Sequence, residues 1–376
     1  MTATERVTEP VAERHAERIT VVGTGLIGTS IALAAVRAGA AVSSWDADDD
    51  VARRASRIAS SRHASSLHDA VEGADIVVVA TPIPTIAPLV VACLASSRHS
   101  VVTDVGSVKT ALVRDTLDLT PAADAPRFVP GHPMGGSERS GPEHASASVV
   151  DGIVWAITPH DTSDPSAVET LERWVGSLGA RAVRLDPDRH DRLVAFVSHL
   201  PQVASTALMS LAATEEAGEP DILLLAAGGF RDLTRLAASD PALWSDIVLA
   251  NAEAIARAID LYTERLTRLR DDIVGKRGAD VEATFHEAKR ARLRLATKPT
   301  VRAGVAVLQI EVPDRPGSLA NLTAVLGTGE VNIEDLQIVH SPEGGRGTVH
   351  LTVAAGAAEH ATSVLTDVGL DPIRLA

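Results

Sequence analysis

The sequence predicts an α/β protein of three domains: a Rossmann-type nucleotide-binding domain, an all-α domain and a small ferredoxin-like α+β domain. The 376 residues exceed the usual size of one domain. Over the first half, apolar β-branched runs alternate with helical stretches, as in a parallel sheet. Strand-like alternation is then absent until about residue 305. The expected divisions are a loose tail 1–17, a nucleotide-binding domain 18–185, a helical domain 186–296, a linker 297–304 and a last domain 305–376.

Composition excludes several classes of protein. The chain carries 35 Lys and Arg against 49 Asp and Glu, a net charge of −14, which argues against a nucleic-acid or anionic-membrane partner. Cys93 is the only cysteine, so an intrachain disulfide and a cysteine-based metal site are impossible. Residues 1–17 are charged and contain no apolar run, unlike a signal peptide or membrane anchor. We therefore expect a cytoplasmic metabolic protein without a metal.

A glycine turn follows the first predicted strand, residues 19–22, and leads into a predicted helix over 29–38. In the pattern G-x-G-x-x-G the first glycine permits a tight turn, the second lets the backbone approach a pyrophosphate, and the third lets helix pack on strand. The free N–H groups of the helix can then bind the phosphates. The alternative is an ordinary strand-to-helix turn. The residues predicted to contact the cofactor here are Gly23, Gly25, Leu26, Ile27 and Gly28.

An acidic residue favours NAD over NADP. The next predicted strand, residues 41–44, is followed by Trp45 and Asp46, close to the offset of about 20 residues expected for a ribose-binding acid. A carboxylate at Asp46 would accept a hydrogen bond from the 2′-hydroxyl and repel a 2′-phosphate. The run 48–50, all aspartate, adds to the negative field.

Two further strands end in residues that suit a ligand site. The apolar run 75–80 predicts a strand buried on both faces, and Thr81 and Pro82 follow it at the sheet edge where ligands bind. These two residues are candidates for nicotinamide or ribose contacts, although they also serve as simple loop punctuation. The predicted strand 100–104 leads to Ser107 at the same edge, where a serine can also cap the following helix. Strand, helix and strand at 154–158, 166–178 and 182–185 complete the domain.

The stretch Gly-His-Pro-Met-Gly-Gly-Ser-Glu at 131–138 is the candidate catalytic loop. It follows a predicted strand at 127–129, so His132 would lie at the edge of the sheet where ligands bind. A histidine there can take a proton near neutral pH. The loop also carries a carboxylate, Glu138. The alternative is a histidine with a purely structural hydrogen bond.

The helical region contains two polar stretches. His199 and Gln202 lie three residues apart, so they can share a helix face. His190 lies about half a turn away from His199 on an unbroken helix, so convergence of the two is not assumed. A second stretch, 228–235, contains Arg231 and Arg235, and arginines near glycines suit bidentate capture of a carboxylate.

Two alternatives remain open for this region. The arginines are equally consistent with solvated side chains that pair with Asp232 or Asp240. The apolar-periodic helices over 243–273 predict a body that dimerises.

The last 72 residues read as β-α-β-β-α-β, the order of a ferredoxin-like unit. The expected elements are a strand 305–312, a turn 314–318, a helix 319–326, a strand 331–340, a hairpin at Gly344 and Gly345, a strand 348–353, a helix 357–368 and an edge strand 372–375. The unit is too short for a second enzyme and carries no obvious nucleophile.

Five motifs together resemble the prephenate/arogenate dehydrogenase family of tyrosine biosynthesis, over about residues 18–376. Beyond residue 305, Asp314-Arg-Pro-Gly317 and Val331-Asn-Ile333 resemble an ACT domain, an amino-acid-sensing module. The five motifs, in family order, are Gly23-x-Gly25-x-x-Gly28, Thr103-Asp104-Val-Gly-Ser107-Val-Lys109, Gly131-His132-Pro133 with Glu138, Ser198-His199-Leu-Pro201, and Gly229-Phe-Arg-Asp232-x-Thr-Arg235.

The resemblance implies oxidative decarboxylation by a homodimer: hydride leaves C4 of a cyclohexadienol for NAD⁺, and CO₂ is lost as the ring becomes aromatic. By resemblance His132 accepts from or deprotonates the 4-hydroxyl, Ser107 orients it, and Arg235 pairs with the substrate side-chain carboxylate. The remaining residues implied near the substrate are His199, with Glu138 and Asp232 as gating acids, Trp244 from the partner subunit, and Arg231 in support.

One departure leaves the substrate open. Many members of the family read Ser-His-Leu-Pro-His where this chain has Gln202, near the substrate side-chain end. An amide can donate to a carboxylate or accept from an ammonium, so prephenate and arogenate both stay open, and we favour prephenate.

The ACT resemblance implies an effector site. It predicts binding of a pathway amino acid, most plausibly tyrosine, across an ACT–ACT contact, with a purely structural dimerisation module as the alternative. The residues expected to bind it are Asp314, Gly317, Ser318 and Asn332.

Two rival functions are weaker. A β-hydroxyacid dehydrogenase would share the first domain, but it would need a catalytic lysine on the first long helix after it, and residues 186–211 contain none. A non-catalytic regulator responsive to NAD and amino acids would have no need of Ser107, His132 and Arg235 together.

Overall fold

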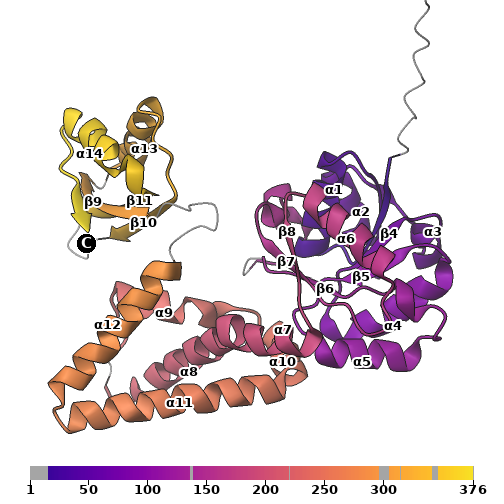
Figure 1. The fold of residues 1–376 in the computed structure, drawn as a ribbon, viewed down its shortest axis with the longest axis horizontal. Coiled ribbons are helices and arrows are strands. Elements are labelled where there is room, and N and C mark those ends of the chain that lie inside the picture. Colours follow the sequence, from indigo (N-terminus) through magenta and orange to yellow (C-terminus); the bar gives the residue numbers. More distant parts are fainter. Residues whose placement is uncertain are drawn as a thin grey trace, which may run out of the picture. The chain divides into compact units, whose positions relative to one another are not determined.

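The computed structural model describes residues 16–135, 139–219, 221–295, 305–313, 315–340 and 346–375. The predicted tail up to residue 15, Glu138, the linker 297–304, Asp314 and the hairpin glycines 344 and 345 lie outside these ranges. The chain forms two compact units: residues up to 207 together with 236–260, and residues 208–235 together with 261 onward (Figure 1).

A five-stranded parallel sheet organises the first unit, as predicted. Its strand order is β3-β2-β1-β4-β5, so the direction of winding reverses between β1 and β4, where doubly wound sheets bind their ligands. The strands are β1 (Arg18–Val22), β2 (Ala41–Trp45), β3 (Arg62–His63), β4 (Ile76–Val79) and β5 (Val101–Asp104).

Helices cover both faces of this sheet because its strands are apolar on both sides. Ile19, Val21 and Ile76 pack with helices α1 and α6, whereas Val22, Val77 and Val79 pack with α4 and α5. Helix α2 connects β2 to β3, and the side chain of Asp48 caps its N-terminus. The helices are α1 (Leu26–Arg37), α2 (Asp49–Ala59), α3 (Leu67–Val71), α4 (Ile83–Ser96), α5 (Thr110–Leu119) and α6 (Pro165–Ser177).

A second, three-stranded sheet corrects the prediction around His132. It contains β6 (Gly131–Pro133), β7 (Val154–Ile157) and β8 (Arg181–Arg184), with β6 antiparallel to β7. The strand predicted at 127–129 is wrong, because Pro126 starts a 3₁₀ turn, η1 (Ala125–Arg127), and only Phe128 forms a bridge with Val102. His132 therefore lies in a strand, paired with Ala156, and not in a loop. Two short turns, η2 (Pro142–His144) and η3 (Ala147–Val150), connect β6 to β7.

The described part of residues 186–295 contains only helices, as predicted. The first helical run is interrupted by a π-helical segment, η4 (Ala195–His199). Pro201 accounts for it, because Pro201 has no N–H for the carbonyl of Val197 and its ring crowds that carbonyl. The region 243–273, where helices were predicted, contains two helices that meet at Asn251. The elements are α7 (Pro187–Val194), α8 (Leu200–Glu215), α9 (Gly228–Thr234), η5 (Arg235–Ala238), α10 (Pro241–Ala250), α11 (Ala252–Val274) and α12 (Gly278–Leu295).

One helical run in the described ranges, Pro187–Glu215, is long and apolar enough to cross a membrane by length and composition. Its polar side chains His190, Asp191 and His199 are nonetheless buried by protein. Of the apolar window of this run, 28% is buried, so much of its apolar surface is exposed.

The C-terminal elements follow the predicted β-α-β-β-α-β order. They form an antiparallel sheet with strand order β10-β11-β9-β12, packed against α13 and α14. The strand predicted at 331–340 begins only at Asp335. Glu334, just before it, donates its N–H to the carbonyl of Thr352. The elements are β9 (Val305–Pro313), α13 (Ser318–Thr328), β10 (Asp335–His340), β11 (Arg346–Ala354), η6 (Ala355–Ala357), α14 (Ala358–Asp367) and β12 (Ile373–Leu375).

Candidate active site

The three glycines of the turn after β1 meet different surroundings. Gly23 has φ +91°, and a Cβ there would lie 2.5 Å from the carbonyl oxygen of Ala80. A Cβ on Gly28 would collide with the carbonyl oxygen of Gly23. A Cβ on Gly25 would meet nothing within 4 Å. The first and third glycines are therefore required by packing, whereas the second borders open space.

That open space lies at the N-terminus of α1, where an anion is favoured. Gly25 is the N-cap and supplies no side-chain hydrogen bond, and the first turn contains no acidic residue. The N–H groups of the first turn therefore lack a side-chain acceptor, and the helix dipole favours negative charge there. Leu26 is buried and Ile27 packs on the core, so these two residues offer mainly backbone to a ligand. The turn fits a dinucleotide pyrophosphate.

Asp46 lies beside this turn. Its carboxylate accepts hydrogen bonds from the backbone N–H of Thr24 at 2.6 Å and from the Thr24 hydroxyl at 3.1 Å. The end of β2 is thus joined to the glycine turn, which is the place for an acid that binds a ribose hydroxyl. Across the turn, a Cβ on Gly23 would also touch Thr81, and Pro82 is the N-cap of α4. All of these residues lie at the carboxyl ends of parallel strands.

His132 is the first member of a hydrogen-bonded chain of side chains. Its Nδ1 lies 2.9 Å from Nε2 of His190, and the two rings meet edge to face. Nδ1 of His190 in turn lies 2.9 Å from Oδ1 of Asp191. His190 and Asp191 are 1% and 4% exposed, whereas His132 is partly exposed. His132 is therefore the one member of this chain that a substrate can reach.

Asp191 is held in place by the start of α5. Its two carboxylate oxygens accept the N–H groups of Lys109 at 2.8 Å and Thr110 at 2.7 Å. Burial opposes ionisation, but the hydrogen bonds from His190 and Thr110 outweigh it and lower the pKa of Asp191. Asp191 is thus the cap of a helix that begins 81 residues earlier in the chain.

This finding decides the alternative for Ser107. The residue before α5 is Lys109, whose side chain makes no cap, and Asp191 supplies the missing acceptors. Ser107 is partly exposed and is not the helix cap. Its hydroxyl makes no hydrogen bond with any residue in the described ranges, so it is available to a ligand.

A fully buried ion pair supports the strand that carries His132. Lys109 Nζ donates to Asp104 Oδ2 and, at 2.7 Å, to the carbonyl oxygen of Gly131. The same aspartate accepts the N–H of Gly131 at 3.2 Å and that of Gly106 at 2.8 Å. Burial lowers the pKa of Lys109, and the neighbouring Asp104 opposes that shift. The N–H and the carbonyl of Gly131 are therefore both held by the ion pair, which fixes the backbone next to His132.

His199 and Trp244 lie together in the same unit. Asn251 Nδ2, at the break between α10 and α11, contacts Nδ1 of His199 at 3.1 Å and the carbonyl of Asp191 at 3.0 Å. The ring of Trp244 lies edge-on to His199, with centroids 6.0 Å apart. Trp244 was predicted to line the site from a partner subunit, and here it contacts a predicted substrate residue of its own chain.

Both site histidines favour the neutral form. Burial lowers the pKa of His199 to about 4, although Asp191 opposes the shift. Burial also lowers the pKa of His132 well below its usual value, with His190, Lys109 and His199 adding to the effect. At neutral pH His132 is thus able to accept a proton.

Gln202 is buried, and its amide is already engaged. Nε2 donates to the carbonyl of Leu236 at 2.7 Å, and Oε1 accepts from the Ser239 hydroxyl at 3.4 Å. Nearby, the Ser205 hydroxyl accepts the N–H of Ala237 at 3.1 Å. These bonds join α8 to the segment 235–239. The structure thus shows that Gln202 holds the segment after η5's first residue against α8, and its selection of the substrate remains a prediction.

The predicted carboxylate-binding stretch belongs to the other unit. Arg231, Asp232 and Arg235 lie exposed on α9 and η5. Within the described residues neither arginine forms an ion pair with Asp232 or Asp240, and Asp240 instead caps α10. The alternative of locally paired arginines is therefore not observed, and their substrate role stays a prediction.

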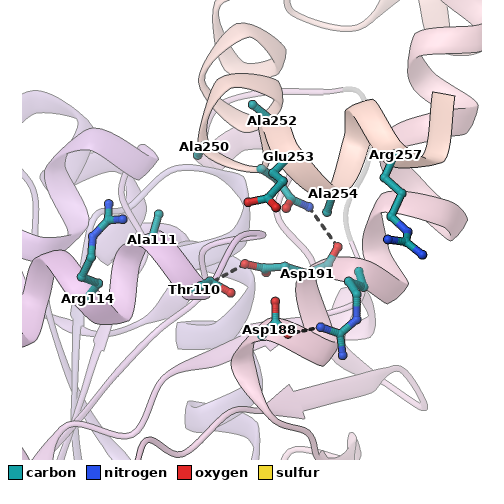
Figure 2. Close-up of a pocket in the computed structure, with 12 residues that line it drawn as sticks. Thr110, Ala111, Arg114, Asp188, Asp191, Ala250, Ala252, Glu253, Ala254 and Arg257 are labelled. Carbon is teal, nitrogen blue, oxygen red and sulfur yellow. Dashed lines mark hydrogen bonds and ion pairs between the residues drawn. The ribbon is translucent and has the colours of Figure 1, made fainter. Parts of the chain in front are cut away.

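Asp191 also lines a cavity of about 600 Å³. Figure 2 shows Thr110 and Asp191 joined by a hydrogen bond in its wall. Arg192 and Asp188, which form an ion pair, also line the cavity. His132, His190 and His199 do not line it, so it is not the place of the chemistry. Its lining consists of Thr110, Ala111, Arg114, Asp188, Asp191, Arg192, Ala250, Asn251, Ala252, Glu253, Ala254 and Arg257.

The expected effector residues are only partly brought together. Gly317 is the N-cap of α13 with φ +92°, and Ser318 lines a cavity of about 420 Å³ with Arg315 and Asn321. Asn332 does not line this cavity, and its side chain donates to Glu334 at 2.6 Å.

Sequence reasoning missed Asp191 and Asn251 and left His190 without a role. Their signals were weak: Asp186 and Pro187 mark a helix start ahead of His190, and Pro201 signals a distorted helix. No sequence pattern relates Asp191 to α5. No group of three His, Cys, Asp or Glu among the described residues has the arrangement of a metal site.

Comparison with known families and proteins gives consistent results. The family model for the nucleotide-binding domain of prephenate dehydrogenase matches residues 31–184, and the model for its dimerization domain matches residues 186–287. A prephenate dehydrogenase of Bacillus subtilis (strain 168) is 31% identical over 343 residues, covering 89% of this chain and 92% of that protein.

Two solved structures share the fold over most of their length. Prephenate dehydrogenase from A. aeolicus, in complex with hydroxyphenyl propionate and NAD⁺, has a TM-score of 0.70 and 28% identity, covering 75% of this chain and 99% of that one. Synechocystis arogenate dehydrogenase has a TM-score of 0.65 and 28% identity, covering 74% and 99%.

Proposed function

This chain belongs to the prephenate dehydrogenase family, and from that membership we propose that it catalyses the NAD-dependent oxidative decarboxylation of prephenate to 4-hydroxyphenylpyruvate in tyrosine biosynthesis. The observation that carries the proposal is His132. It is a partly exposed, neutral histidine whose Nδ1 is engaged by His190, which leaves Nε2 for a substrate. It stands on a strand beside β5, in the domain with the dinucleotide turn.

Bound NAD⁺ supplies the hydride acceptor for C4 of the substrate. His132 Nε2 accepts the proton of the 4-hydroxyl as the C4 carbonyl forms, a role for which a neutral imidazole is required. The free hydroxyl of Ser107 orients the 4-hydroxyl. When the bond from C1 to the carboxylate breaks, its electrons move into the ring, CO₂ leaves, and His132 returns the proton to the oxygen. The protein needs only to bind the substrate and provide one proton acceptor, because aromatisation drives the reaction.

Arg235 pairs with the side-chain carboxylate of the substrate in this proposal. An exposed guanidinium without an ion-pair partner among the described residues suits that role. Its loss would cost affinity on the order of 2–5 kcal/mol if the carboxylate is left buried. Arg231 supports it, and Glu138 and Asp232 act as gating acids.

Arogenate is the second candidate substrate. It differs from prephenate by an amino group in place of a keto group, and one structural relative is named for it. We favour prephenate because the B. subtilis and A. aeolicus relatives carry that name.

NADH formation with each substrate tests the proposal. We expect turnover of prephenate, and we expect His132→Asn to lower kcat by about 10²–10⁴-fold while NAD⁺ binding is retained. Faster turnover of arogenate would reverse the substrate assignment. Turnover of neither, with NAD⁺ bound, would refute the enzyme and favour the regulator.

The same proposal includes a preference for NAD⁺ over NADP⁺. Asp46 at the end of β2 presents a carboxylate where a 2′-phosphate would lie, so repulsion disfavours NADP⁺. Comparing kcat/KM for the two cofactors in the wild type and in Asp46→Ser measures this. A preference that the substitution leaves unchanged would assign selectivity to another residue.

We also propose that the protein is a cytoplasmic homodimer. The matched dimerization domain and the exposed apolar side chains of the helices support this. Sedimentation should give twice the mass of 39.2 kDa. Exposed examples are Phe196, Val197, Leu211, Leu249, Leu266 and Phe285.

Tyrosine is the proposed effector of the C-terminal ACT-like domain, at Asp314, Gly317, Ser318 and Asn332. The element order of the domain and the cavity next to Ser318 support it. Calorimetry should detect tyrosine binding to the wild type and none after deletion of 305–376. Absence of binding to the wild type would leave a structural dimerisation module.

A further inference from the structure

The protonation state of each ring in the chain from Asp191 to His132 follows from its hydrogen bonds. Asp191 accepts two backbone N–H groups, so it is a carboxylate, and the Nδ1 of His190 beside it must carry the hydrogen. In a neutral His190 the Nε2 is then bare and can only accept. Nδ1 of His132, 2.9 Å away, must donate to it. Nε2 of His132 therefore presents a lone pair.

The same chain of atoms has a second state. When Nε2 of His132 takes a proton, the Nδ1 proton can cross to Nε2 of His190 without movement of either ring. The positive charge then lies on His190, against the Asp191 carboxylate. If the positive charge stayed on His132 instead, the imidazole ring of His190 would separate it from that carboxylate.

The surroundings favour the charge on His190. The ionisable groups around His132 are His190 and Asp191 on α7, His199 on η4, and Lys109 before α5, which is paired with Asp104. Among these groups Asp191 is the one anion without a cationic partner of its own. It contacts His190 directly, whereas Lys109 opposes positive charge on His132.

We propose that His190 and Asp191 are positioning residues of a proton relay. When His132 takes the substrate proton on Nε2, its Nδ1 proton passes to His190, which carries the positive charge during the hydride step and then returns that proton. This inference rests on the proposed function. The O–H bond breaks as the His132 Nε2–H bond forms, and the His132 Nδ1–H bond breaks as the His190 Nε2–H bond forms. Decarboxylation reverses both transfers. The reaction releases no net proton, so the relay needs no outlet to water, which agrees with a His190 that is 1% exposed.

The resting state can be tested without turnover. Long-range ¹H–¹⁵N spectra of the ¹⁵N-histidine-labelled protein distinguish protonated from bare ring nitrogens. We expect a bare Nε2 and a protonated Nδ1 in both His132 and His190, assigned with His132→Asn and His190→Gln. The opposite tautomer of His132 would overturn the relay, because its lone pair would then face His190.

Kinetics of two variants test the transfer itself. His190→Gln places an amide acceptor near Nε2 but cannot take a proton, so kcat should fall about 10²–10³-fold with KM and NAD⁺ affinity nearly unchanged. Asp191→Asn should move the acidic limb of the kcat–pH profile down by on the order of 1 pH unit, because the cation loses its anion. A purely structural role would leave that limb in place.

The controls separate the possible failures. His160 is also hydrogen-bonded, through Nε2 to the carbonyl of Phe128 at 3.0 Å, and lies outside the relay, so His160→Gln should keep wild-type kcat. If Asp191→Asn fails to fold because α5 loses its cap, His190→Gln carries the test. Wild-type kcat in His190→Gln would overturn the relay. Absence of turnover in the wild type would refute the proposed function, and the spectra would still decide the tautomers.

Discussion

Gly25 and Gly28 offer a paired test of the cofactor site, because the structure predicts opposite effects for the same added methyl group. Gly25 has φ −68° and ψ −160°, which alanine tolerates, and its Cβ would meet open space. A less flexible unfolded chain stabilises Gly25→Ala by about 0.4–1 kcal/mol. Replacing an N-cap glycine by alanine costs about 0.7 kcal/mol, the difference between the typical N-cap penalties of alanine, about 1, and glycine, about 0.3. The net change in stability should therefore stay below about 1 kcal/mol.

The effect of Gly25→Ala should appear in cofactor binding. The methyl group would occupy the space that the pyrophosphate needs at the start of α1, so NAD⁺ affinity should fall on the order of 10–100-fold, about 1.4–2.7 kcal/mol. Calorimetric titration with NAD⁺ measures this. Binding as tight as in the wild type would refute the placement of the pyrophosphate at Gly25.

Gly28→Ala should act on the fold. Its Cβ would collide with the Gly23 carbonyl and lie 3.2 Å from Cβ of Ala80. Alanine gains about 1 kcal/mol in helix propensity, but overpacking costs about 1–3 kcal/mol, and a collision with backbone lies at the upper end. We expect a fall in Tm of about 2–4 °C per kcal/mol of net loss. The control is Gly176→Ala, on helix α6 with nothing within 4 Å, which should not lower Tm. A Gly28→Ala protein as stable as the wild type would contradict the packing argument.

Three further predictions concern buried side chains of the first unit. Gln202→Ala should cost about 1–3 kcal/mol in denaturant titrations, because it leaves a carbonyl unpaired, and it should change the ratio of kcat/KM for prephenate and arogenate. An unchanged ratio would leave Gln202 with its structural role alone. Lys109→Met should cost about 3–5 kcal/mol, since it leaves the buried Asp104 carboxylate uncompensated, and a loss below 1 kcal/mol would argue against the ion pair. The pKa of His199 is lowered from 6.5 to about 4, so the unfolded state binds the extra proton between these values and stability should fall as pH drops through that window. Unfolding titrations of His199→Gln should show a smaller slope, the remainder coming from groups such as His132 whose pKa is also lowered, and an equal slope in the variant would assign all of it to those groups.

Much of the fold follows from local patterns in the sequence. The strands around 19–22 and 76–79 and the glycine turn are specified by residues within a few positions of each other, and the structure reproduces them. The all-helical region and the β-α-β-β-α-β order are local in the same sense. The predicted family and dehydrogenase class are confirmed by the relatives.

The hydrogen-bonded chain of the proposed relay could not be predicted from the sequence, because it joins residues that lie far apart in the sequence. On an unbroken helix His190 and His199 would lie about half a turn apart, but the π-helical segment between them changes this relation. His132 was assigned to a loop because a three-residue strand has no visible period. Helices were predicted over 243–273, but only the structure shows that the division between them falls at Asn251 and that the Asn251 amide contacts both His199 and the carbonyl of Asp191.

The capping of α5 by Asp191 has a consequence for the order in which the chain folds. The family match for the nucleotide-binding domain ends at residue 184, so a fragment cut there would lose the two acceptors of the α5 N-terminus. During synthesis the N-terminal half stays incomplete until α7 has left the ribosome. A graft of the nucleotide-binding half that is to keep this cap must therefore carry the chain through α7, to Val194.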